Sequence, residues 1–233
     1  MVDLHNHLIY GVDDGVKSLD ESIKMILAAK ENGYSALIIT PHYIEDSIYS
    51  SSVKQNSEIL FTIKEELKNQ NIDIELYLGN EFMLSNNVLD LLEEKEISTL
   101  NSSRYLLVEL SQNMKYDYLV DKIDLLIKKG IVPIIAHPER YDFLELQQFK
   151  EFVNHGALLQ LDAGSLLGAY GKHAKKRARL LIKANLIYVV SSDTHRKENF
   201  SYLSKTKKIV NKIMPSVVED IFEINPRKIL RNN

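Results

Sequence analysis

Short runs of apolar and β-branched residues alternate along the chain with longer segments whose apolar residues recur at helical spacing. Seven of the short runs are predicted to be strands, and helical segments follow most of them. The predicted strands are Val2 to His5, Ala36 to Thr40, Ile74 to Leu78, Tyr105 to Leu110, Val132 to Ala136, Leu158 to Leu161 and Leu186 to Ser191. Strands that alternate with helices are typical of βα units around a parallel sheet. The pattern therefore predicts an α/β fold.

Local signals mark the ends of two predicted helices. Ser18 and Glu21 have the spacing of a capping box at a helix start, and Gly33 stands where the same helix would stop. Residues 128–130, two lysines followed by a glycine, would end another helix with cations near its negative pole. Residues 43–56 are rich in Ser and Tyr with weak periodicity, which predicts a loop on the functional face.

Composition narrows the class of protein. A chain of 233 residues, 45% hydrophobic and 26% charged, can bury a large core and has the length of one α/β barrel, so a single domain over residues 1–233 is expected. The formal charge of -3 and the pI near 6.2 lack the broad basic field of a nucleic-acid-binding protein. We therefore expect no nucleic-acid partner.

Cysteine and membrane signals are both missing from the sequence. Without cysteine, disulfides, thiolate nucleophiles and Cys-based zinc sites are excluded, and any metal must be held by nitrogen and oxygen atoms. The first apolar segment already carries Asp3, His5 and His7, which fits no signal peptide, and no run has the length of a membrane span. These features predict a cytoplasmic protein without membrane insertion.

Metal-competent side chains stand at the carboxyl ends of six of the seven predicted strands. They occur in His5-Asn6-His7, Thr40-Pro41-His42, Gly79-Asn80-Glu81, Val108-Glu109, His137-Pro138-Glu139-Arg140 and Asp193-Thr194-His195. In a parallel barrel all these ends open on one face, where the catalytic groups of such barrels are found. Imidazole together with carboxylate oxygen suits Zn, Mn or Fe better than Ca or an all-oxygen Mg cage. The set predicts a centre of divalent cations.

Each motif has a plainer interpretation when it is taken alone. The two histidines of a His-x-His motif lie on one side of an extended segment, about 7 Å apart, and need a bend to reach one ion. Glu81 or Glu109 alone would be an ion-pair or cap residue, and Asp13-Asp14-Gly15 alone reads as a turn. Arg140 offers a fork of donors that suits a phosphate or carboxylate, with a salt bridge to a neighbouring acid as the alternative.

Other polar residues are predicted to lie outside this centre. His155, before Gly156 at a helix end, is interpreted as structural because an imidazolium there can meet exposed carbonyl groups. A basic helical segment around His173 is predicted to be a solvated face, with a docking surface for an acidic peptide as the alternative. Its cations are Lys172, Lys175, Lys176, Arg177 and Arg179. Ser165 and Ser192 lack a nucleophile-elbow pattern, which disfavours a Ser-His-Asp hydrolase.

Taken together, these stretches resemble the PHP (polymerase and histidinol phosphatase) superfamily and, within it, the bacterial capsule-type tyrosine-protein phosphatases. The matching stretches, which span essentially the whole chain, are DLHNH, GVDDG, TPHY, GNE, VEL, AHPERY, GSLLGAYG, SSDTH and NPRKIL. The resemblance implies the PHP fold, a distorted seven-stranded (β/α)7 TIM-like barrel. It also implies hydrolysis of phosphotyrosine, with the tail of a bacterial tyrosine kinase that regulates capsular or exopolysaccharide synthesis as the protein partner.

The resemblance further implies three clustered divalent ions, manganese first, with iron, zinc, cobalt or magnesium as alternatives. By that likeness, His5, His7, Glu81 and Asp193 would hold one ion, Glu81, Glu109 and His137 a second, and Asp14, His42 and His195 a third. Three such ions bring about +6 and four carboxylates about -4, so with one hydroxide the centre would attract a phosphate dianion. Metal binding would also supply hydroxide at neutral pH, so that no covalent enzyme intermediate is needed.

Catalytic and substrate-binding roles follow from the same resemblance. Arg140 matches the family arginine that grips the phosphate, and Asp193 and His195 complete the residues implied in catalysis. A second substrate-binding arginine, expected several residues beyond SSDTH, has no clean counterpart. Arg196 or Lys197 would take its place.

Three rival functions remain open at this point. The nearest is a phosphatase of the same superfamily that acts on histidinol phosphate or another small phosphomonoester. A nuclease or proofreading module is disfavoured because the sequence shows no polymerase segment or basic groove. A binding subunit without catalysis is disfavoured because buried, mutually repelling carboxylates have no physical purpose without metals.

Overall fold

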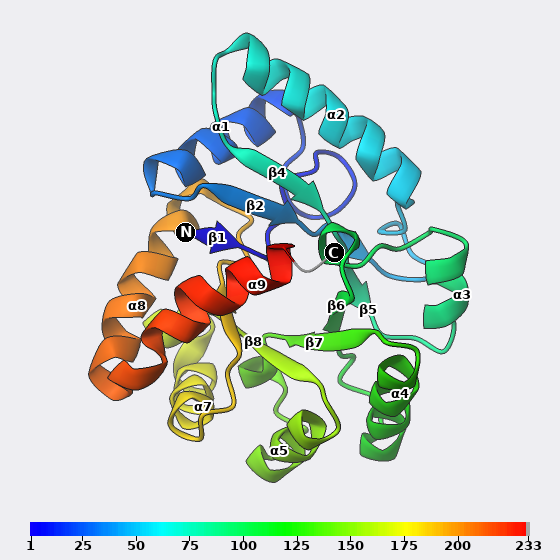
Figure 1. The fold of residues 1–233 in the computed structure, drawn as a ribbon, viewed down its shortest axis with the longest axis vertical. Coiled ribbons are helices and arrows are strands. Elements are labelled where there is room, and N and C mark those ends of the chain that lie inside the picture. The colour runs from blue at the N-terminus through cyan, green and yellow to red at the C-terminus, as the bar shows by residue number, and fades with distance from the viewer. Residues whose placement is uncertain (232–233) are drawn as a thin grey trace.

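The strands of this computed structural model form two parallel sheets (Figure 1). The structure describes residues 1–231, so residues 232–233 of the predicted domain lie outside the described part. The smaller sheet has the order β1-β2-β4, with bounds Val2–Asp3, Ala36–Ile39 and Glu75–Leu78. The larger sheet has the order β3-β5-β6-β7-β8-β9, with bounds His42–Tyr43, Glu81–Met83, Tyr105–Glu109, Val132–Ala136, Leu158–Asp162 and Val189–Ser191.

Each of the seven predicted strand regions contains a strand, and the α/β class with parallel pairing is confirmed. Two additional short strands, β3 and β5, follow β2 and β4 after two-residue interruptions. Pro41 interrupts the first because it has no N–H for the ladder. Gly79 lies in the second, where a Cβ would come within 2.7 Å of the Leu100 side chain. The described residues thus form nine strands, and the predicted count of seven is not confirmed.

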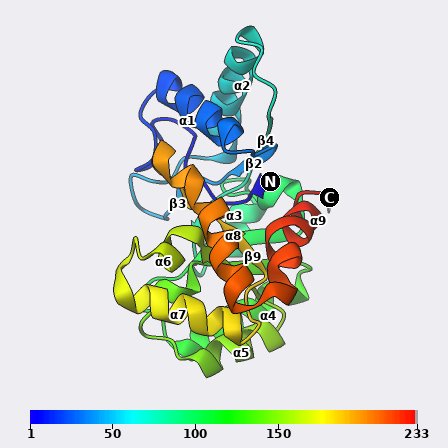
Figure 2. The same ribbon diagram turned by 90° about the vertical axis from the view of Figure 1, so that its left-hand side faces the viewer.

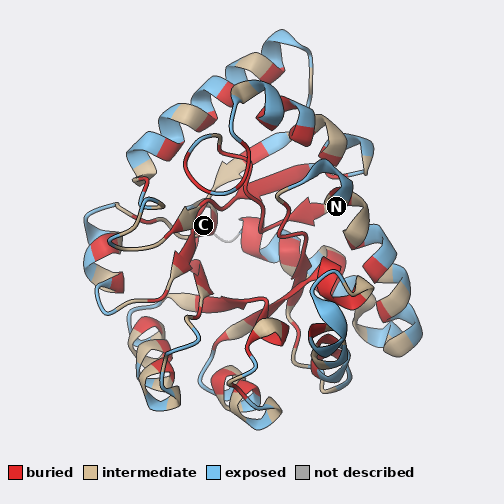
Figure 3. Cartoon of the chain, turned by 180° about the vertical axis from the view of Figure 1, so that it is seen from behind, coloured by how far each residue is buried: buried red, intermediate tan, exposed pale blue. Residues whose placement is uncertain are grey.

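Most helices surround the strands on the outside, and α9 lies across one end of the strands (Figures 1 and 2). Their bounds are α1 Leu19–Glu31, α2 Val53–Asn69, α3 Val88–Glu93, α4 Tyr116–Lys128, α5 Leu146–Asn154, α6 Ala163–Leu167, α7 Gly171–Lys183, α8 Ser201–Ile213 and α9 Asn225–Arg231. Figure 3 shows buried residues along the strands and on the inner sides of these helices, as expected for an apolar core between the two layers. Within the described chain, no helix is both long and apolar enough to cross a bilayer.

The predicted helix ends are largely confirmed. The Ser18 hydroxyl accepts a hydrogen bond from the Glu21 N–H at 3.3 Å. The Glu21 carboxylate accepts from the Lys17 N–H rather than from Ser18, so only half of the predicted capping box forms. Gly33 and Gly130 directly follow the helix caps with φ of 85° and 79°, a left-handed conformation that favours glycine.

The predicted loop at residues 43–56 is wrong at both ends. Tyr43 belongs to β3, and residues 53–56 form the first turn of α2. The Ser52 hydroxyl caps this helix by accepting the Gln55 N–H at 3.3 Å, a local signal that outweighs the weak periodicity. Only the residues between these two elements are irregular.

Two predictions about surface cations need correction. Arg177 is not part of a solvated face, because its guanidinium donates to the carbonyl groups of Tyr141 and Leu144 at 2.9 and 2.6 Å. These carbonyls lie in a turn without a strand partner, so the arginine satisfies them. The His155 imidazole lies beside the Asp124 carboxylate at 2.7 Å, which links α5 to α4, rather than meeting helix carbonyl groups. Of the other cations, Lys172, Lys176 and Arg179 are exposed and Lys175 is half-buried.

Candidate metal centre

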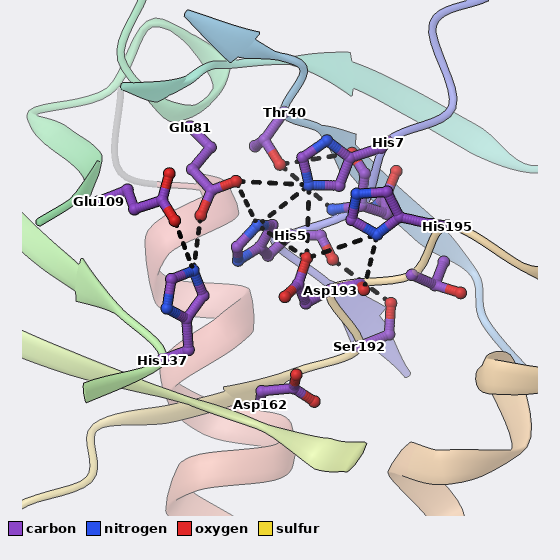
Figure 4. A network of polar contacts seen from close by, with 12 residues as sticks. His5, His7, Thr40, Glu81, Glu109, His137, Asp162, Ser192, Asp193 and His195 are labelled. Carbon is purple, nitrogen blue, oxygen red and sulfur yellow. Dashed lines mark hydrogen bonds and ion pairs between the residues drawn. The ribbon is translucent and has the colours of Figure 1, made fainter. Parts of the chain in front are cut away.

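All nine predicted metal ligands converge near the carboxyl ends of the strands. Figure 4 shows the part of this cluster formed by His5, His7, Glu81, Glu109, His137, Asp193 and His195. Their ligand atoms form three overlapping groups, and within each group these atoms lie within 4.8 Å of one another. The groups are His5, His7, Glu81 and Asp193; His42, Glu81 and Glu109; and His7, Asp14, His42 and His195. His137 lies beside the second group. Nitrogen and oxygen donors at this spacing are a ligand set for divalent cations such as Zn, Mn or Fe.

Glu81 lies at the middle of the centre and faces four imidazoles. Its Oε2 atom is 3.1 Å from His5 Nε2, 3.4 Å from His7 Nε2 and 3.0 Å from His42 Nδ1. Its Oε1 atom is 2.9 Å from His137 Nε2. The pairing of β3 with β5 brings His42 directly opposite Glu81. A buried carboxylate with candidate ligand nitrogens close to both of its oxygens is placed to bridge two cations.

The two histidines of the DLHNH motif are oriented by contacts on their outer nitrogens. His5 Nδ1 lies 3.0 Å from Gln160 Oε1, and His7 Nδ1 lies 2.8 Å from Asp13 Oδ2. Because both partners are acceptors, each Nδ1 donates a hydrogen bond, and each Nε2 faces Glu81, where it can bind a cation once it has lost its own proton. Outer contacts of this kind hold metal-ligating histidines in the required tautomer and orientation.

The turn at residues 13–15 wraps around His7. Asp13 accepts the Gly15 N–H at 2.9 Å with one oxygen and faces His7 with the other. A Cβ at Gly15 would lie 2.3 Å from the His7 carbonyl oxygen, so only glycine permits this approach. Asp14 is turned outward, and its carboxylate lies 3.3 Å from His195 Nε2. The turn interpretation is therefore correct for the backbone, and both carboxylates also contact the centre.

Two of the candidate ligands have left-handed backbones. The φ angles are 32° at His137 and 45° at Asp193, a conformation that is costly for residues other than glycine and is concentrated at functional sites. The Asp193 N–H donates to the His5 carbonyl group at 2.9 Å. Next to it, the Asp3 carboxylate accepts from the Ser192 N–H at 2.8 Å. These contacts direct the Asp193 side chain toward the two histidines of DLHNH.

Burial and charge act against each other in this centre. Burial opposes the charged form of His5, but Glu81 and Asp193 outweigh it and raise the pKa of His5 to about 9. Burial, together with the neighbouring Glu81, raises the pKa of Glu109 to about 8. His42 Nδ1 is buried 3.0 Å from Glu81 Oε2 and has no hydrogen-bond partner among the described residues. This spacing fits two ligand atoms that bind one cation between them. The carboxylates thus require nearby positive charge, which divalent cations can supply.

Arg140 lies at the wall of a cleft above the centre. Its guanidinium pairs with Asp162 and, at 2.7 Å, with Asp193, so the salt bridge to neighbouring acids is present. The cleft has a volume of about 660 Å³. It is lined by Asp14, His42, Glu81, Glu109, His137, Arg140, Ala169, Tyr170, Asp193, His195, Arg196, Asn199 and Tyr202. Arg196 therefore reaches the cleft, whereas Lys197 is exposed and does not line it.

Four residues that support the centre were not predicted. Gln160 and Asp13 orient the histidines of DLHNH, and Asp162 and Tyr170 contact Arg140. Gln160 did carry a signal, since it is a polar residue inside an otherwise apolar strand. Asp162 ends β8, one residue beyond the sixth predicted strand, which is the one to which no chemistry was assigned. All seven strand ends therefore contribute to the centre or its support.

Comparison with known proteins finds relatives that match most or nearly all of the chain. Residues 1–231 match the family described as "Capsular polysaccharide synthesis, CpsB/CapC". The putative tyrosine-protein phosphatase CapC of Staphylococcus aureus is 34% identical over 88% of this chain and 81% of its own length. The tyrosine-protein phosphatase CpsB of Streptococcus pneumoniae is 31% identical over 99% of this chain and 98% of its own.

Solved structures show the same likeness. The chain matches a structure from the work on YwqE from Bacillus subtilis and CpsB from Streptococcus pneumoniae, described as unique metal-dependent tyrosine phosphatases. The TM-score is 0.88 at 28% identity, and the match covers 100% of this chain and 95% of the other. The lactonase Lmo2620 from Listeria monocytogenes matches with a TM-score of 0.63 at 12% identity, which shows a shared fold alone.

Proposed function

Because this chain belongs to the CpsB/CapC family of capsular polysaccharide synthesis, we propose that it is a metal-dependent protein-tyrosine phosphatase that hydrolyses phosphotyrosine. The observation that carries this proposal is the convergence of three nitrogen and oxygen ligand groups around Glu81, beneath an open cleft. Relatives that match nearly the whole chain are named tyrosine-protein phosphatases, which supports the same substrate.

We further propose that the centre holds three divalent ions, manganese first among the candidates. The group His5, His7, Glu81 and Asp193 has the composition expected for the first ion. His137 supports the second site, since its Nε2 atom lies 2.9 Å from Glu81 and 3.7 Å from Glu109. The third set of Asp14, His42 and His195 is joined by His7. Iron, zinc, cobalt and magnesium are the alternative ions.

The chemistry divides between the ions and the side chains. Bound divalent ions lower the pKa of a water molecule from 15.7 to roughly 7 and so supply hydroxide at neutral pH. Arg140 is proposed to bind the phosphate, and Asp193 holds its guanidinium at 2.7 Å while also facing His5. His195 is proposed to serve the reaction from the cleft wall, where its imidazole is 28% exposed. With no cysteine in the chain, a thiolate nucleophile is excluded.

Arg196 is the better candidate for the second phosphate-binding cation. It lines the same cleft as Arg140, whereas Lys197 does not. A guanidinium also offers a planar fork of donors that suits a phosphate better than an ammonium group does.

We infer that the two sheets act as one distorted seven-stranded barrel of the PHP fold, in a single domain. In this description β2 with β3, and β4 with β5, are each one interrupted strand. A bridge between Asn6 and Thr194 supports closure, because it joins the residues after β1 to those after β9.

We propose that the protein is cytoplasmic and that its partner is the phosphotyrosine-bearing tail of a bacterial tyrosine kinase that regulates capsular or exopolysaccharide synthesis. Support comes from the family description and from the names of the relatives, which combine capsule synthesis with tyrosine dephosphorylation.

A substrate panel tests the proposed function. Purified protein would be assayed with a phosphotyrosine peptide, a phosphoserine peptide, histidinol phosphate and single-stranded DNA, each with and without manganese. We expect manganese-dependent hydrolysis of phosphotyrosine above all, because phenolate leaves more readily than an alkoxide. A clear preference for phosphoserine or histidinol phosphate would contradict the tyrosine assignment, and cleavage of DNA would point to a nuclease.

A further inference from the structure

The aromatic ring of Tyr170 covers the guanidinium of Arg140. The Arg140 Cζ atom lies 3.6 Å from the centre of the Tyr170 ring, which is contact distance for a cation–π interaction. Asp162 and Asp193 hold the same guanidinium through its Nη2 atom. Its Nε atom is buried and has no hydrogen-bond partner among the described residues. The guanidinium is thus fixed by two carboxylates and one ring at the wall of the cleft.

The backbone around Tyr170 is built to place this ring. Tyr170 lies between Gly168, which ends α6 with a φ of 94°, and Gly171, which begins α7 with a φ of 88°. A Cβ at Gly171 would meet no atom within 4 Å, so glycine is required there by the backbone direction and not by lack of space. The two left-handed residues define the direction in which the segment between the helices presents its ring.

The ring of Tyr202 lies close to the Tyr170 ring, on the same side of Gly164. A Cβ at Gly164 would lie 3.2 Å from Tyr170 Cε2 and 3.2 Å from Tyr202 Cδ2. Both tyrosines line the cleft, and 43% of Tyr170 remains exposed. One wall of the cleft is therefore aromatic, whereas most of the other residues that line the cleft are polar.

We propose that Tyr170 is a positioning and specificity residue for aryl phosphates. Its ring holds the Arg140 guanidinium in the orientation that receives the phosphate, and its exposed edge, with Tyr202, contacts the aromatic ring of the substrate. This inference rests on the proposed phosphatase function and adds to it the residues that favour phosphotyrosine over aliphatic phosphomonoesters. Offset or edge contacts between aromatic rings, together with the cation–π contact, supply the selectivity.

The test compares Tyr170→Phe, Tyr170→Leu and Tyr170→Ala in the metal-loaded protein. KM and kcat would be measured with a phosphotyrosine peptide, phenyl phosphate and a phosphoserine peptide, and the binding of inorganic phosphate by calorimetry. Tyr170→Phe should stay within about twofold of the wild type because it keeps the ring. Tyr170→Ala should raise KM for both aryl substrates and weaken phosphate binding by about fivefold to tenfold, with a smaller change in kcat. Metal content should not change.

Tyr170→Leu distinguishes the effect of the aromatic ring from the effect of side-chain volume, because leucine fills space without an aromatic face. If leucine or alanine matches the wild type in KM and phosphate binding, the proposal is wrong. If the alanine variant loses its metals, Tyr170 is a structural residue and the proposal is equally wrong. Failure of the proposed function looks different, since the wild type itself would then hydrolyse no phosphotyrosine while the phosphate-binding comparison could still be made.

Gly171→Ala and Gly130→Ala form a matched control pair. Both glycines have a left-handed φ, at 88° and 79°, and a Cβ added at either would have no other atom within 4 Å, so the backbone strain is alike. Gly171→Ala should turn Tyr170 and raise KM for aryl substrates, whereas Gly130→Ala, after α4, should leave KM unchanged. Equal KM values in the two variants would contradict the role of the α6–α7 segment.

Discussion

The floor and the rim of the centre are held in different ways. The floor consists of His5, His7, Glu81 and Asp193, and the rim consists of Asp14, His42 and His195. Floor side chains are at most 4% exposed, whereas those of the rim reach 52% at Asp14. The floor histidines have outer partners in Gln160 and Asp13, while the Asp14 carboxylate lies 3.3 and 3.6 Å from the imidazoles of His195 and His42.

This difference indicates separate roles for the two regions. Charges attract each other more strongly where water is excluded, so a cation on the floor gains more from its ligands than one on the rim. Ligands that are already oriented also lose less freedom when a cation binds. We therefore expect the floor to retain its ions and the rim to exchange its ion with solvent, next to the place where substrate enters.

Glu81→Ala should have the largest effect, because it removes the carboxylate that faces four imidazoles. We expect kcat/KM to fall by more than about a hundredfold and bound metal to be clearly lost. This loss exceeds the roughly 10- to 100-fold loss that is typical when only an outer contact of a metal ligand is removed. His42→Ala should do less damage. Metal analysis and kinetics on both variants would check this order, and a Glu81 variant with wild-type metal content would contradict the bridging role.

Asp13→Ala tests whether outer contacts hold the floor together. The variant removes the acceptor for His7 Nδ1 and should lower metal affinity or activity by about 10- to 100-fold. Asp20→Ala is the control, since Asp20 lies on the exposed surface of α1 and, within residues 1–231, forms its ion pair with Lys24 alone. Chelator competition would measure the affinity. Equal affinities in the two variants would show that His7 needs no partner to bind metal.

Arg140 connects the floor to the substrate cleft, because it pairs with Asp193 and lines the wall. Charge-assisted hydrogen bonds contribute about 1.5 to 3 kcal/mol each, and about 1.4 kcal/mol corresponds to a factor of ten. Arg140→Lys keeps the charge but loses the fork, so kcat/KM should fall roughly tenfold or more, and further in Arg140→Ala. Metal content should stay unchanged in both. A fully active Arg140→Ala variant would contradict the role of Arg140 and would indicate that Arg196 binds the phosphate instead.

Asp14→Ala should give the smallest loss and one that added metal reverses. The carboxylate is exposed and contributes to a single ligand group, so we expect about a fivefold to tenfold weaker rim site. Activity measured against manganese concentration should shift to higher concentration and reach nearly the same maximum. A loss that no manganese concentration reverses would show that the rim is as tightly built as the floor.

The sequence predicted which residues gather but not how they pair. Strand ends of a parallel barrel meet on one face, so His5, Glu109 and His137 could be placed there from pattern alone. The pairing of His42 with Glu81 depends on β3 and β5, which are too short to show an alternating pattern. The overlap of the ligand groups at His7 and His42 likewise needs side-chain directions.

The supporting contacts were harder to predict because they join distant parts of the chain. Gln160 lies 155 positions from the His5 that it orients. Asp162 lies 22 positions from Arg140, and nothing in either local sequence links the two. Arg177 lies in a run of cations typical of a solvated helix face, yet its partners are carbonyl groups of the turn at Tyr141 and Leu144. Single-sequence patterns describe the element, whereas these contacts depend on how elements pack.

The most direct test of metal-dependent phosphotyrosine hydrolysis is one chelation and reconstitution measurement. The protein would be stripped with a chelator, its metal content verified, and its activity on a phosphotyrosine peptide followed as manganese, cobalt or zinc is added back. We predict that activity disappears with the metal and returns on addition, because the proposed nucleophile exists only on bound ions. Full activity in the verified metal-free protein would contradict the account.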